Sequence, residues 1–326
     1  MRADRDVPAE LKGTLKAAQL YYIQDMTMDA IARELGTSRS TVSRMIGKAK
    51  ENGLVDIQIR FPSDQAERIQ HLIRSRYGVT SHVVPVPNLA DETERLERVA
   101  MTAGRVLSGI FDSNMSLGVA WGVTIEALSR HLQPKETNHS KIVQLNGSGG
   151  MQKGGVEYPS IILQRFAEAF GAMTHAFHVP QFFDDPAVRN AMWKERSVRR
   201  HIQLQSHVDV ALFGLGAPQT GSPDRAHRTD FVSDEDYATL AQAGVVGDIA
   251  TVFFRADGTD DNIPINSRST GLPLKQLRKV PRRVCVVSGR AKLLGLRGAL
   301  EGGLITDLVI DEPTARWIAN AISPRN

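Results

Sequence analysis

The feature that most constrains the fold of this chain is a repeated alternation of short, mostly apolar runs with amphipathic helical segments. Strands that alternate with helices form a mainly parallel sheet, and strands buried on both faces lack a polar side. The pattern therefore predicts a doubly wound α/β domain. Its expected strands are residues 82–87, 116–120, 142–145, 174–179, 208–215, 249–254, 283–287 and 308–310.

The first 61 residues follow a different pattern, in which helical segments come first. A helix is expected over residues 9–24, and a second helix begins at the capping residue Thr27 and ends at Gly36, where a left-handed turn is needed. Thr37 or Ser38 can cap a third helix. Helix, tight turn and helix in this order predict a helix-turn-helix.

Residues 54–61 alternate apolar and polar side chains, which is the period of a half-buried strand. A strand placed directly after these helices fits the wing of a winged helix-turn-helix. Pro62 and the polar residues after it break the pattern. We therefore expect two domains, a winged helix-turn-helix over residues 1–61 and the larger α/β domain over residues 62–326.

The third helix has a cationic face. Between Ser38 and Lys50 the chain has four basic residues and no acidic one. A helix fits the major groove of B-DNA, where its first side chains reach base edges while Lys and Arg neutralise phosphates. An ordinary solvated helix face is the alternative interpretation. The candidate DNA-binding residues are Arg39, Ser40, Thr41, Ser43, Arg44 and Lys48.

The overall composition excludes several classes of protein. With 40 Lys and Arg against 36 Asp and Glu the net charge is only +4, so any contact with DNA must be local. Cys285 is the single cysteine, which excludes disulfide scaffolds and Cys-rich zinc modules. His175 and His178 have an odd spacing in an expected strand, so they point to opposite faces and no shared metal is expected.

The sequence also lacks the motifs of the common enzyme classes and of export. No HExxH, Walker A or GxSxG motif is present, so we expect no catalytic group and no cofactor. The amino terminus lacks the apolar core of a signal peptide, and no run reaches the length of a transmembrane helix. We therefore expect a cytoplasmic protein.

Ligand-binding residues are expected in the loops that follow strands, because open α/β sheets bind ligands at the carboxyl ends of their strands. The loop of residues 118–124 offers glycines, backbone N–H groups and a hydroxyl to an anion. The glycine cluster of residues 146–150 follows another strand, although it can be a plain turn. In residues 288–292 two cations begin a helix, which is unfavourable for the helix dipole unless an anion is bound there.

Further candidates come from single residues around these loops. Asp248 can accept hydrogen bonds from sugar hydroxyls or serve as a turn residue, and Lys292 can bind phosphate or only solubilise the surface. Residues 214–216 are candidates for the mouth of the pocket, and Arg268 for a second phosphate contact. The complete set of candidate effector-binding residues is Gly118, Gly122, Thr124, Asn146, Gly147, Asp248, Arg268 and Lys292.

Several motifs together resemble the SorC/DeoR family of sugar-responsive bacterial transcriptional regulators. The amino-terminal motifs are Ala18-Gln-Leu-Tyr-Tyr22 and the run of residues 31–44, and the carboxyl-terminal ones are Val246-Gly-Asp-Ile249, Val287-Ser-Gly-Arg-Ala-Lys292 and Leu308-Val-Ile-Asp-Glu-Pro-Thr-Ala315. The resemblance covers nearly the whole chain. One departure is Arg255 after Phe253 and Phe254, where the family commonly has an acidic residue.

The resemblance implies a fold akin to sugar-phosphate isomerases and CoA transferases, in a domain that binds a sugar, polyol or sugar-phosphate effector and forms homo-oligomers, often tetramers, on operator DNA. It also implies that residues 118–124 and Lys292 hold the phosphate, while Asp248 and Asn146 contact sugar oxygens. The expected function is regulation of a carbohydrate or polyol catabolic operon. The alternative is a sugar-phosphate isomerase or hydrolase with an accessory DNA-binding arm, for which Asp248 is the candidate general base.

Overall fold

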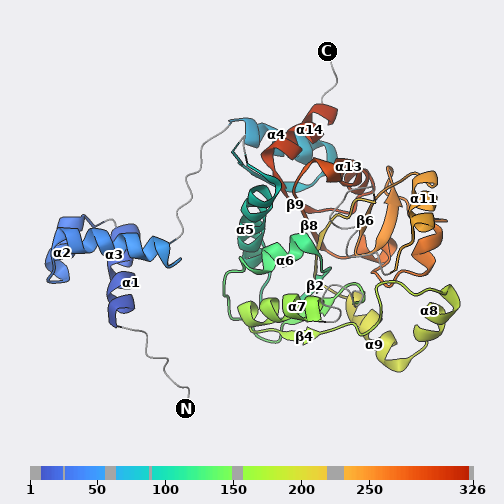
Figure 1. The fold of residues 1–326 in the computed structure, drawn as a ribbon, viewed down its shortest axis with the longest axis horizontal. Helices are drawn as coiled ribbons and strands as arrows, with labels where there is room; N and C mark the ends of the chain where they lie inside the picture. Colours follow the sequence, from blue (N-terminus) through green and yellow to red (C-terminus); the bar gives the residue numbers. More distant parts are fainter. Residues whose placement is uncertain are drawn as a thin grey trace. The chain divides into compact units, whose positions relative to one another are not determined.

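The computed structural model of the protein divides into two compact units, Met1–Pro62 and Ser63–Asn326 (Figure 1). The residues that it describes are 9–24, 26–55, 64–87, 90–148, 157–218 and 231–322.

The described part of the first unit consists of the helices α1 (Ala9–Tyr22), α2 (Met28–Glu34) and α3 (Arg39–Glu51). Thr27 caps α2, since its side chain accepts the backbone N–H of Ala30, and Ser38 caps α3 by accepting that of Thr41 at 3.2 Å. Gly36 lies between the two helices with φ of 61°. These observations confirm the predicted caps and the left-handed turn, with Ser38 and not Thr37 as the cap of α3.

A small apolar core holds the three helices together. It consists of Ala17, Leu20, Ile31, Ala32, Val42 and Ile46, all of them buried. The predicted wing, residues 54–61, lies mostly outside the described residues and stays a prediction. Leu54 and Val55, which are described, donate their backbone N–H groups to the carbonyl oxygen of Ala49 and so continue the turn that ends α3.

In the described residues of the second unit, seven strands form one sheet in the order β1-β9-β8-β5-β2-β3-β4, and every neighbouring pair is parallel. This confirms the predicted parallel α/β fold. The strands are β1 (Thr80–Val84), β2 (Ser116–Val119), β3 (Lys141–Gln144), β4 (Met173–His175), β5 (Val210–Gly214), β8 (Arg282–Val287) and β9 (Asp307–Asp311).

One expected strand is wrong. Residues 249–254 do not form a single strand but span a hairpin of β6 (Val245–Ile249) and β7 (Val252–Arg255), which pair antiparallel apart from the main sheet. Ala250 and Thr251 make the turn with φ of 49° and 71°. The sequence hides this turn because neither residue is a glycine or an asparagine, the residues that usually adopt positive φ.

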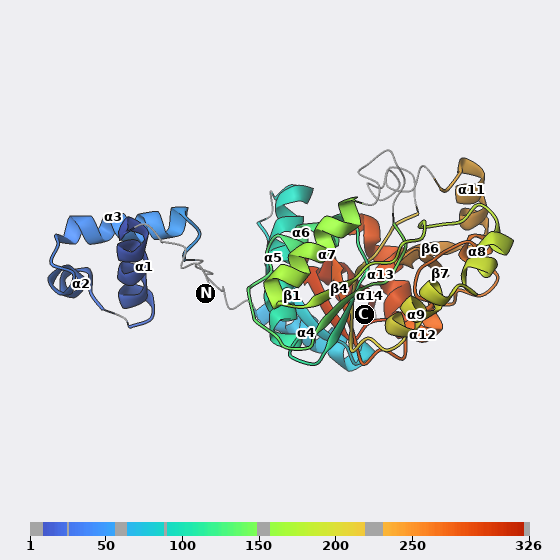
Figure 2. The same ribbon diagram turned by 90° about the horizontal axis from the view of Figure 1, so that it is seen from below.

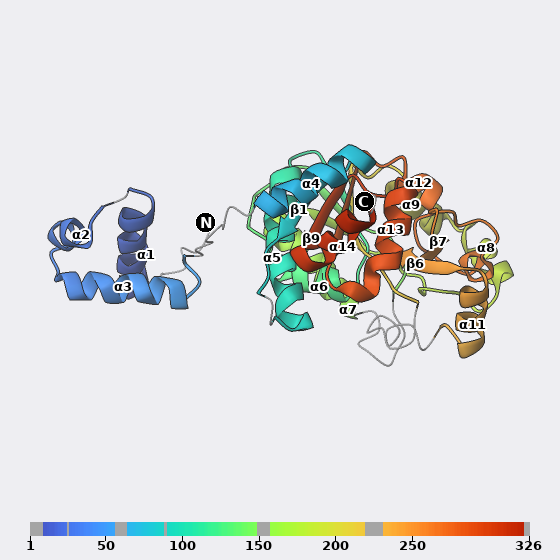
Figure 3. The ribbon, with the colours of Figure 1, turned by 90° about the horizontal axis from the view of Figure 1, so that it is seen from above.

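Helices cover both faces of the parallel sheet (Figures 2 and 3). One face packs against α5 (Glu92–Ile110), α6 (Val123–Ser129) and α7 (Glu157–Phe170), and the other against α4 (Asp64–Tyr77), α13 (Leu293–Glu301) and α14 (Glu312–Ile322). The sheet thus has an apolar core on each face, and successive residues of a strand point to opposite cores. Val284 packs in the core on the α5 side and Cys285 in the core on the α4 side. The sheet is therefore doubly wound, as predicted.

The remaining helical segments of the described residues belong to the carboxyl-terminal half of the chain. They are α8 (Pro186–Met192), α9 (Arg196–Gln205), α11 (Asp234–Gln242), η2 (Pro264–Ser267), α12 (Leu274–Leu277) and η3 (Arg290–Lys292). Cys285 is a free, fully buried thiol whose pKa is raised by that burial. It is therefore an unreactive packing residue.

Candidate functional site

Helix α3 separates a buried face from a polar one. Val42, Ile46 and Ala49 are buried against α1 and α2, while most of the candidate DNA-binding residues lie on the outer side. The exposed candidates are Arg39, Ser40, Ser43, Arg44 and Lys48, and Thr41 is half-buried. The outer face thus presents three cations and several hydroxyls, which is what contact with a DNA backbone and base edges needs.

Several of these candidates already have partners within the unit, among them Arg39 and Thr41. Arg39 lies 3.8 Å from the carboxylate of Asp29 (Nε to Oδ2), and both side chains are about 70% exposed, so this ion pair is weak and easily exchanged for a phosphate. The Thr41 hydroxyl lies 2.9 Å from the Ser38 hydroxyl and therefore belongs to the cap of α3. The main role of Thr41 within this unit is therefore to stabilise the start of α3.

A pocket opens at the carboxyl ends of β2, β3, β5 and β8, the edge where open parallel sheets bind ligands. Five of the eight candidate effector residues line it. These are Gly122, Thr124, Asn146, Asp248 and Lys292. Gly214 and Gly216, expected at the mouth, also line it, as does Trp121 of the predicted loop 118–124. Sequence reasoning missed other lining residues, among them Gln181 and Thr251.

Two of the residues that line this pocket supply a cation and a hydroxyl. The ammonium group of Lys292 lies 3.4 Å from the hydroxyl of Thr124, although 168 residues separate them in the chain. Thr124 is buried and Lys292 is half-buried. Gly289 gives its N–H to a carboxylate oxygen of Asp311 at 3.0 Å, and this bond fixes the loop that carries Lys292. This pair is suited to an anionic group.

Other residues of the lining supply buried hydrogen-bond acceptors. The side-chain carbonyl oxygens of Asn146 and Gln181 have no hydrogen-bond partner among the described residues, although the two residues are only 1% and 4% exposed. A buried polar atom left without a partner costs about 1–3 kcal/mol. The buried carboxylate of Asp248 lines the same pocket and accepts the backbone N–H of Thr251 at 3.2 Å. These acceptors are suited to hydroxyl groups of a ligand.

A hydrogen-bond network behind the pocket fixes Asn146. The amide of Gln144 donates to the backbone carbonyl of Asn146 at 2.7 Å and accepts the N–H of Phe177 at 3.0 Å. The backbone carbonyl oxygen of Gln144 lies 2.8 Å from the ring nitrogen Nε2 of His201 and accepts a hydrogen bond from the side-chain amide of Gln205. Sequence periodicity gave no signal of this network, because it joins residues about 30 to 60 positions apart.

Three candidate effector residues lie outside the pocket. A side chain at Gly118 would meet Leu145 at 2.6 Å, and one at Gly147 would meet the carbonyl oxygen of Pro180 at 2.3 Å, so both glycines permit close packing. Arg268 is paired with Asp236 at 2.6 Å, and the expectation that it contacts phosphate gains no support. Arg255, the departure from the family pattern, donates to the carbonyl oxygens of Ala243 and Asp261, also outside the pocket.

Within the described ranges the protein has neither a candidate metal site nor a candidate membrane span. No cluster of three or more His, Cys, Asp or Glu side chains there could hold a metal ion. None of the helices in the same ranges combines the length and apolarity that crossing a bilayer requires.

Family models match both units. Residues 63–320 match the model Sugar-bind, which describes a sugar-binding domain, and residues 25–55 match the model of bacterial regulatory proteins of the crp family. The second match spans α2, the turn and α3, and supports their assignment as a helix-turn-helix.

Relatives extend the similarity over the whole chain. A deoxyribonucleoside regulator from Bacillus subtilis is 34% identical over 313 residues, which cover 94% of this chain and 97% of the relative. A solved domain of a possible sugar-binding transcriptional regulator from Arthrobacter aurescens is 47% identical with a TM-score of 0.74, and covers 80% of this chain and 100% of its own.

The full-length sorbitol operon regulator SorC from Klebsiella pneumoniae superimposes with a TM-score of 0.82 at 25% identity, over 95% of this chain and 98% of that one. These relatives are named as transcriptional regulators, which confirms the expected class over the enzyme alternative. The chain belongs to the SorC/DeoR family of sugar-binding bacterial transcriptional regulators.

Proposed function

We propose that this protein regulates an operon for the catabolism of a carbohydrate or polyol, and that a sugar, polyol or sugar phosphate bound in the pocket controls its binding to operator DNA. The observation that carries the proposal is that one pocket is lined by two kinds of groups: the ammonium of Lys292 beside the hydroxyl of Thr124, and the side-chain oxygens of Asn146 and Gln181, which have no partner among the described residues.

The chemistry of the pocket supports this class of effector. A phosphate or another anionic oxygen gains charge-assisted hydrogen bonds from Lys292 and Thr124. Two or more hydroxyl groups supply the donors that Asn146 and Gln181 lack, and Asp248 accepts another. The names of the relatives, a deoxyribonucleoside regulator and a sorbitol operon regulator, point to effectors of the same chemistry.

The first unit supplies the DNA contacts in this proposal. Arg39, Ser40, Thr41, Ser43, Arg44 and Lys48 are the proposed DNA-binding residues. The resemblance to the SorC/DeoR family implies oligomers on operator DNA, so we propose a homo-oligomer, dimer or tetramer, in the cytoplasm. The effector acts because it binds one arrangement of the oligomer more tightly than another, and only such a difference in affinity shifts the equilibrium.

The test is an electrophoretic mobility shift assay of the full-length protein on the promoter upstream of its own gene. The assay is repeated with sorbitol, deoxyribose and their phosphate monoesters. We expect a sequence-specific complex whose stability changes with at least one of these compounds, and loss of that response in Lys292→Ala with DNA binding retained. Absence of any specific complex, or a complex indifferent to every sugar tested, contradicts the proposal.

The DNA contacts are tested in the same assay. Arg39→Ala and Arg44→Ala should each weaken specific binding by about 1–3 kcal/mol if they read a guanine edge, because a bidentate contact is lost. Lys48→Ala should weaken binding to all sequences alike and lower its salt dependence. Lys16→Ala, an exposed lysine of α1, is the matched control and should leave binding unchanged.

A further inference from the structure

Asp311, the last residue of β9, has a fully buried carboxylate. It is not among the described residues that line the effector pocket, the one to which Lys292 and Thr124 belong. Burial of a carboxylate is costly unless hydrogen bonds and a nearby cation replace its hydration. The partners of Asp311 therefore indicate what this residue does.

The two oxygens of this carboxylate bond two different parts of the chain. Oδ2 accepts the backbone N–H of Gly289, at 3.0 Å, in the loop that carries Lys292. Oδ1 accepts the backbone N–H and the hydroxyl of Thr314, at 3.0 and 2.9 Å, in the first turn of α14. The guanidinium of Arg95 from α5 lies 3.7 Å from Oδ1. One oxygen thus holds the loop, and the other joins the framework of helices.

The loop between β8 and α13 has little rigidity of its own. Gly289 has φ of 91°, a conformation that favours glycine, and the three-residue segment η3 follows it directly. The N–H of Lys292 lies 3.5 Å from the carbonyl oxygen of Gly289, which is longer than an ordinary N–H···O bond. The bond from Gly289 to Asp311 therefore fixes the start of the turn from which Lys292 reaches Thr124.

The other cation of this loop is turned outward. Arg290 is exposed, and its guanidinium carbon lies 4.4 Å from the centre of the Trp317 ring in α14. Lys292 lines the effector pocket, whereas Arg290 is not among its described lining residues. The loop is thus held at two successive residues, Gly289 by the end of β9 and Arg290 by α14, and it directs Lys292 to the pocket.

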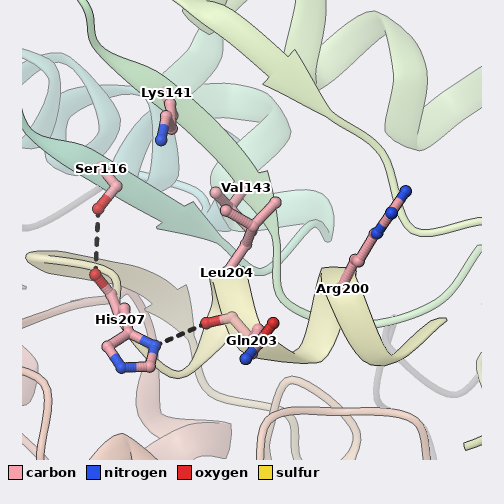
Figure 4. A pocket seen from close by; sticks show the side chains of 7 residues that line it. All are labelled: Ser116, Lys141, Val143, Arg200, Gln203, Leu204 and His207. Carbon is pink, nitrogen blue, oxygen red and sulfur yellow. Dashed lines mark hydrogen bonds between the residues drawn. The ribbon is translucent and has the colours of Figure 1, made fainter. Parts of the chain in front are cut away.

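Lys292 differs from exposed cations at the opposite edge of the sheet. In the open depression at the amino ends of β2 and β3, the side chains of Lys141 and Arg200 point away from each other (Figure 4). Lys292 is half-buried, and its ammonium group lies 3.4 Å from the buried hydroxyl of Thr124. A cation that is fixed before the ligand arrives binds it more tightly, because less freedom is lost on binding.

We propose that Asp311 is a positioning residue of the effector pocket: it holds Gly289 so that Lys292 stands where an anionic oxygen of the effector binds. Asp311 acts through Lys292 and does not contact the ligand. The proposal rests on the function proposed above, in which Lys292 binds the anionic group. The alternative is a role in the cap of α14 alone, which would change stability but not the affinity for anions.

The variant Asp311→Asn separates these two roles, because an amide has one acceptor oxygen and one NH2 group. Thr314 supplies two donors and Arg95 lies on the same side, so the amide oxygen should stay there. The NH2 group then faces the N–H of Gly289, and the bond to the loop is lost. Binding of inorganic phosphate to the full-length protein is measured by phosphorus NMR titration, which follows weak affinities.

We expect Lys292→Ala and Asp311→Asn each to weaken phosphate binding about ten-fold, because one charge-assisted contact is removed or misplaced. The double variant should bind phosphate no more weakly than Lys292→Ala alone, because both residues act through the same contact. Thr314→Val is the matched control. It removes a bond to the other oxygen of Asp311 and should leave phosphate affinity unchanged.

Gly289→Ala alters the same loop without changing the buried carboxylate, and it decides the question if Asp311→Asn does not fold. A Cβ there has open space but a strained φ, so phosphate binding should again weaken about ten-fold. The proposal is overturned if both loop variants bind phosphate like the wild type while Lys292→Ala does not. It is also overturned if Asp311→Asn weakens binding further in the Lys292→Ala protein, or if Thr314→Val weakens it equally.

Failure of the proposed function gives a different result in the same titration. If the wild type binds no phosphate, or if Lys292→Ala binds it like the wild type, Lys292 is not an anion-binding residue. The role proposed for Asp311 is then overturned together with the role of Lys292.

Discussion

Side chains in and behind the effector pocket fall into two groups that a substitution can tell apart. Asn146 and Gln181 line the pocket and have buried carbonyl oxygens without partners among the described residues, whereas the side chain of Gln144, behind the pocket, both donates and accepts a hydrogen bond. A buried oxygen without a partner destabilises the unliganded protein, and a ligand that donates a hydrogen bond to it removes this cost. A residue of the second kind stabilises the protein whether or not a ligand is bound.

We predict that Gln181→Met weakens effector binding by about 1–3 kcal/mol, because methionine has a similar shape but cannot accept the hydrogen bond from the ligand. The free energy of unfolding of the unliganded protein should stay the same or rise, because the buried oxygen without a partner is removed. Gln144→Met, the matched control, should lower the free energy of unfolding by about 1–3 kcal/mol. Calorimetric titration and urea unfolding measure the two quantities. A Gln181→Met protein with unchanged effector affinity would remove this residue from the binding site.

His201 should make stability depend on pH. It is buried, and this burial lowers its pKa below the ordinary value of 6.5. The unfolded chain therefore takes up a proton more readily than the folded protein. The free energy of unfolding contributed by His201 is fully present above pH 6.5 and falls as the pH drops toward the folded pKa.

Urea unfolding at pH 7.5 and at pH 5.5 checks this expectation, and His201→Gln should reduce the difference between the two conditions. His82 and His175 also have pKa values lowered by burial, so part of the dependence should remain. If His201→Gln leaves the whole pH dependence intact, His201 is not its source.

At the level of elements, local chemistry predicts helix ends well. Thr27 and Ser38 stand directly before α2 and α3, and each accepts the backbone N–H three residues ahead, as the capping rules require. The hairpin of β6 and β7 is the opposite case, because its turn residues Ala250 and Thr251 give no local signal. Contacts with residues farther along the chain help to hold that turn, such as the hydrogen bond between the hydroxyls of Thr251 and Ser269 at 2.9 Å.

The cap of α3 gives a prediction about this element alone. Ser38→Ala should destabilise the helix by about 0.5–2 kcal/mol, because the N–H of Thr41 loses its acceptor. Hydrogen exchange followed by mass spectrometry on peptides from α3 measures the effect as faster exchange. Ser43→Ala, on the exposed side of the same helix, should exchange like the wild type. Equal exchange in both variants would show that the cap contributes little.

For the molecule as a whole, the sequence predicts the architecture better than the site. The alternation of apolar runs and helices is enough for the parallel sheet, and the carboxyl ends of its strands locate the pocket. Five candidate residues do line it, but Gly118, Gly147 and Arg268 do not. A glycine that makes room for Pro180 looks the same in sequence as one that makes room for a ligand, because only the fold shows what lies opposite.

The two units should respond differently to an effector. All described residues of the pocket belong to the unit Ser63–Asn326, so a bound effector should raise the temperature at which that unit unfolds. The free energy of unfolding of that unit should rise by about 2.7 kcal/mol at an effector concentration of one hundred times Kd. Differential scanning calorimetry measures it, and Ser38→Ala identifies the transition of the first unit. A shift confined to the first unit's transition would place the effector site elsewhere.

Asp248 lies on the hairpin of β6 and β7, whereas Asn146 and Thr124 follow strands of the parallel sheet. The pocket is thus assembled from two separately hydrogen-bonded pieces, joined where Gly216 and Asp248 exchange backbone bonds. Residues of the hairpin can diverge without disturbing the ladder of the larger sheet. A family built on this plan can acquire new ligand preferences by altering a short accessory piece, while the framework that makes folding possible stays the same.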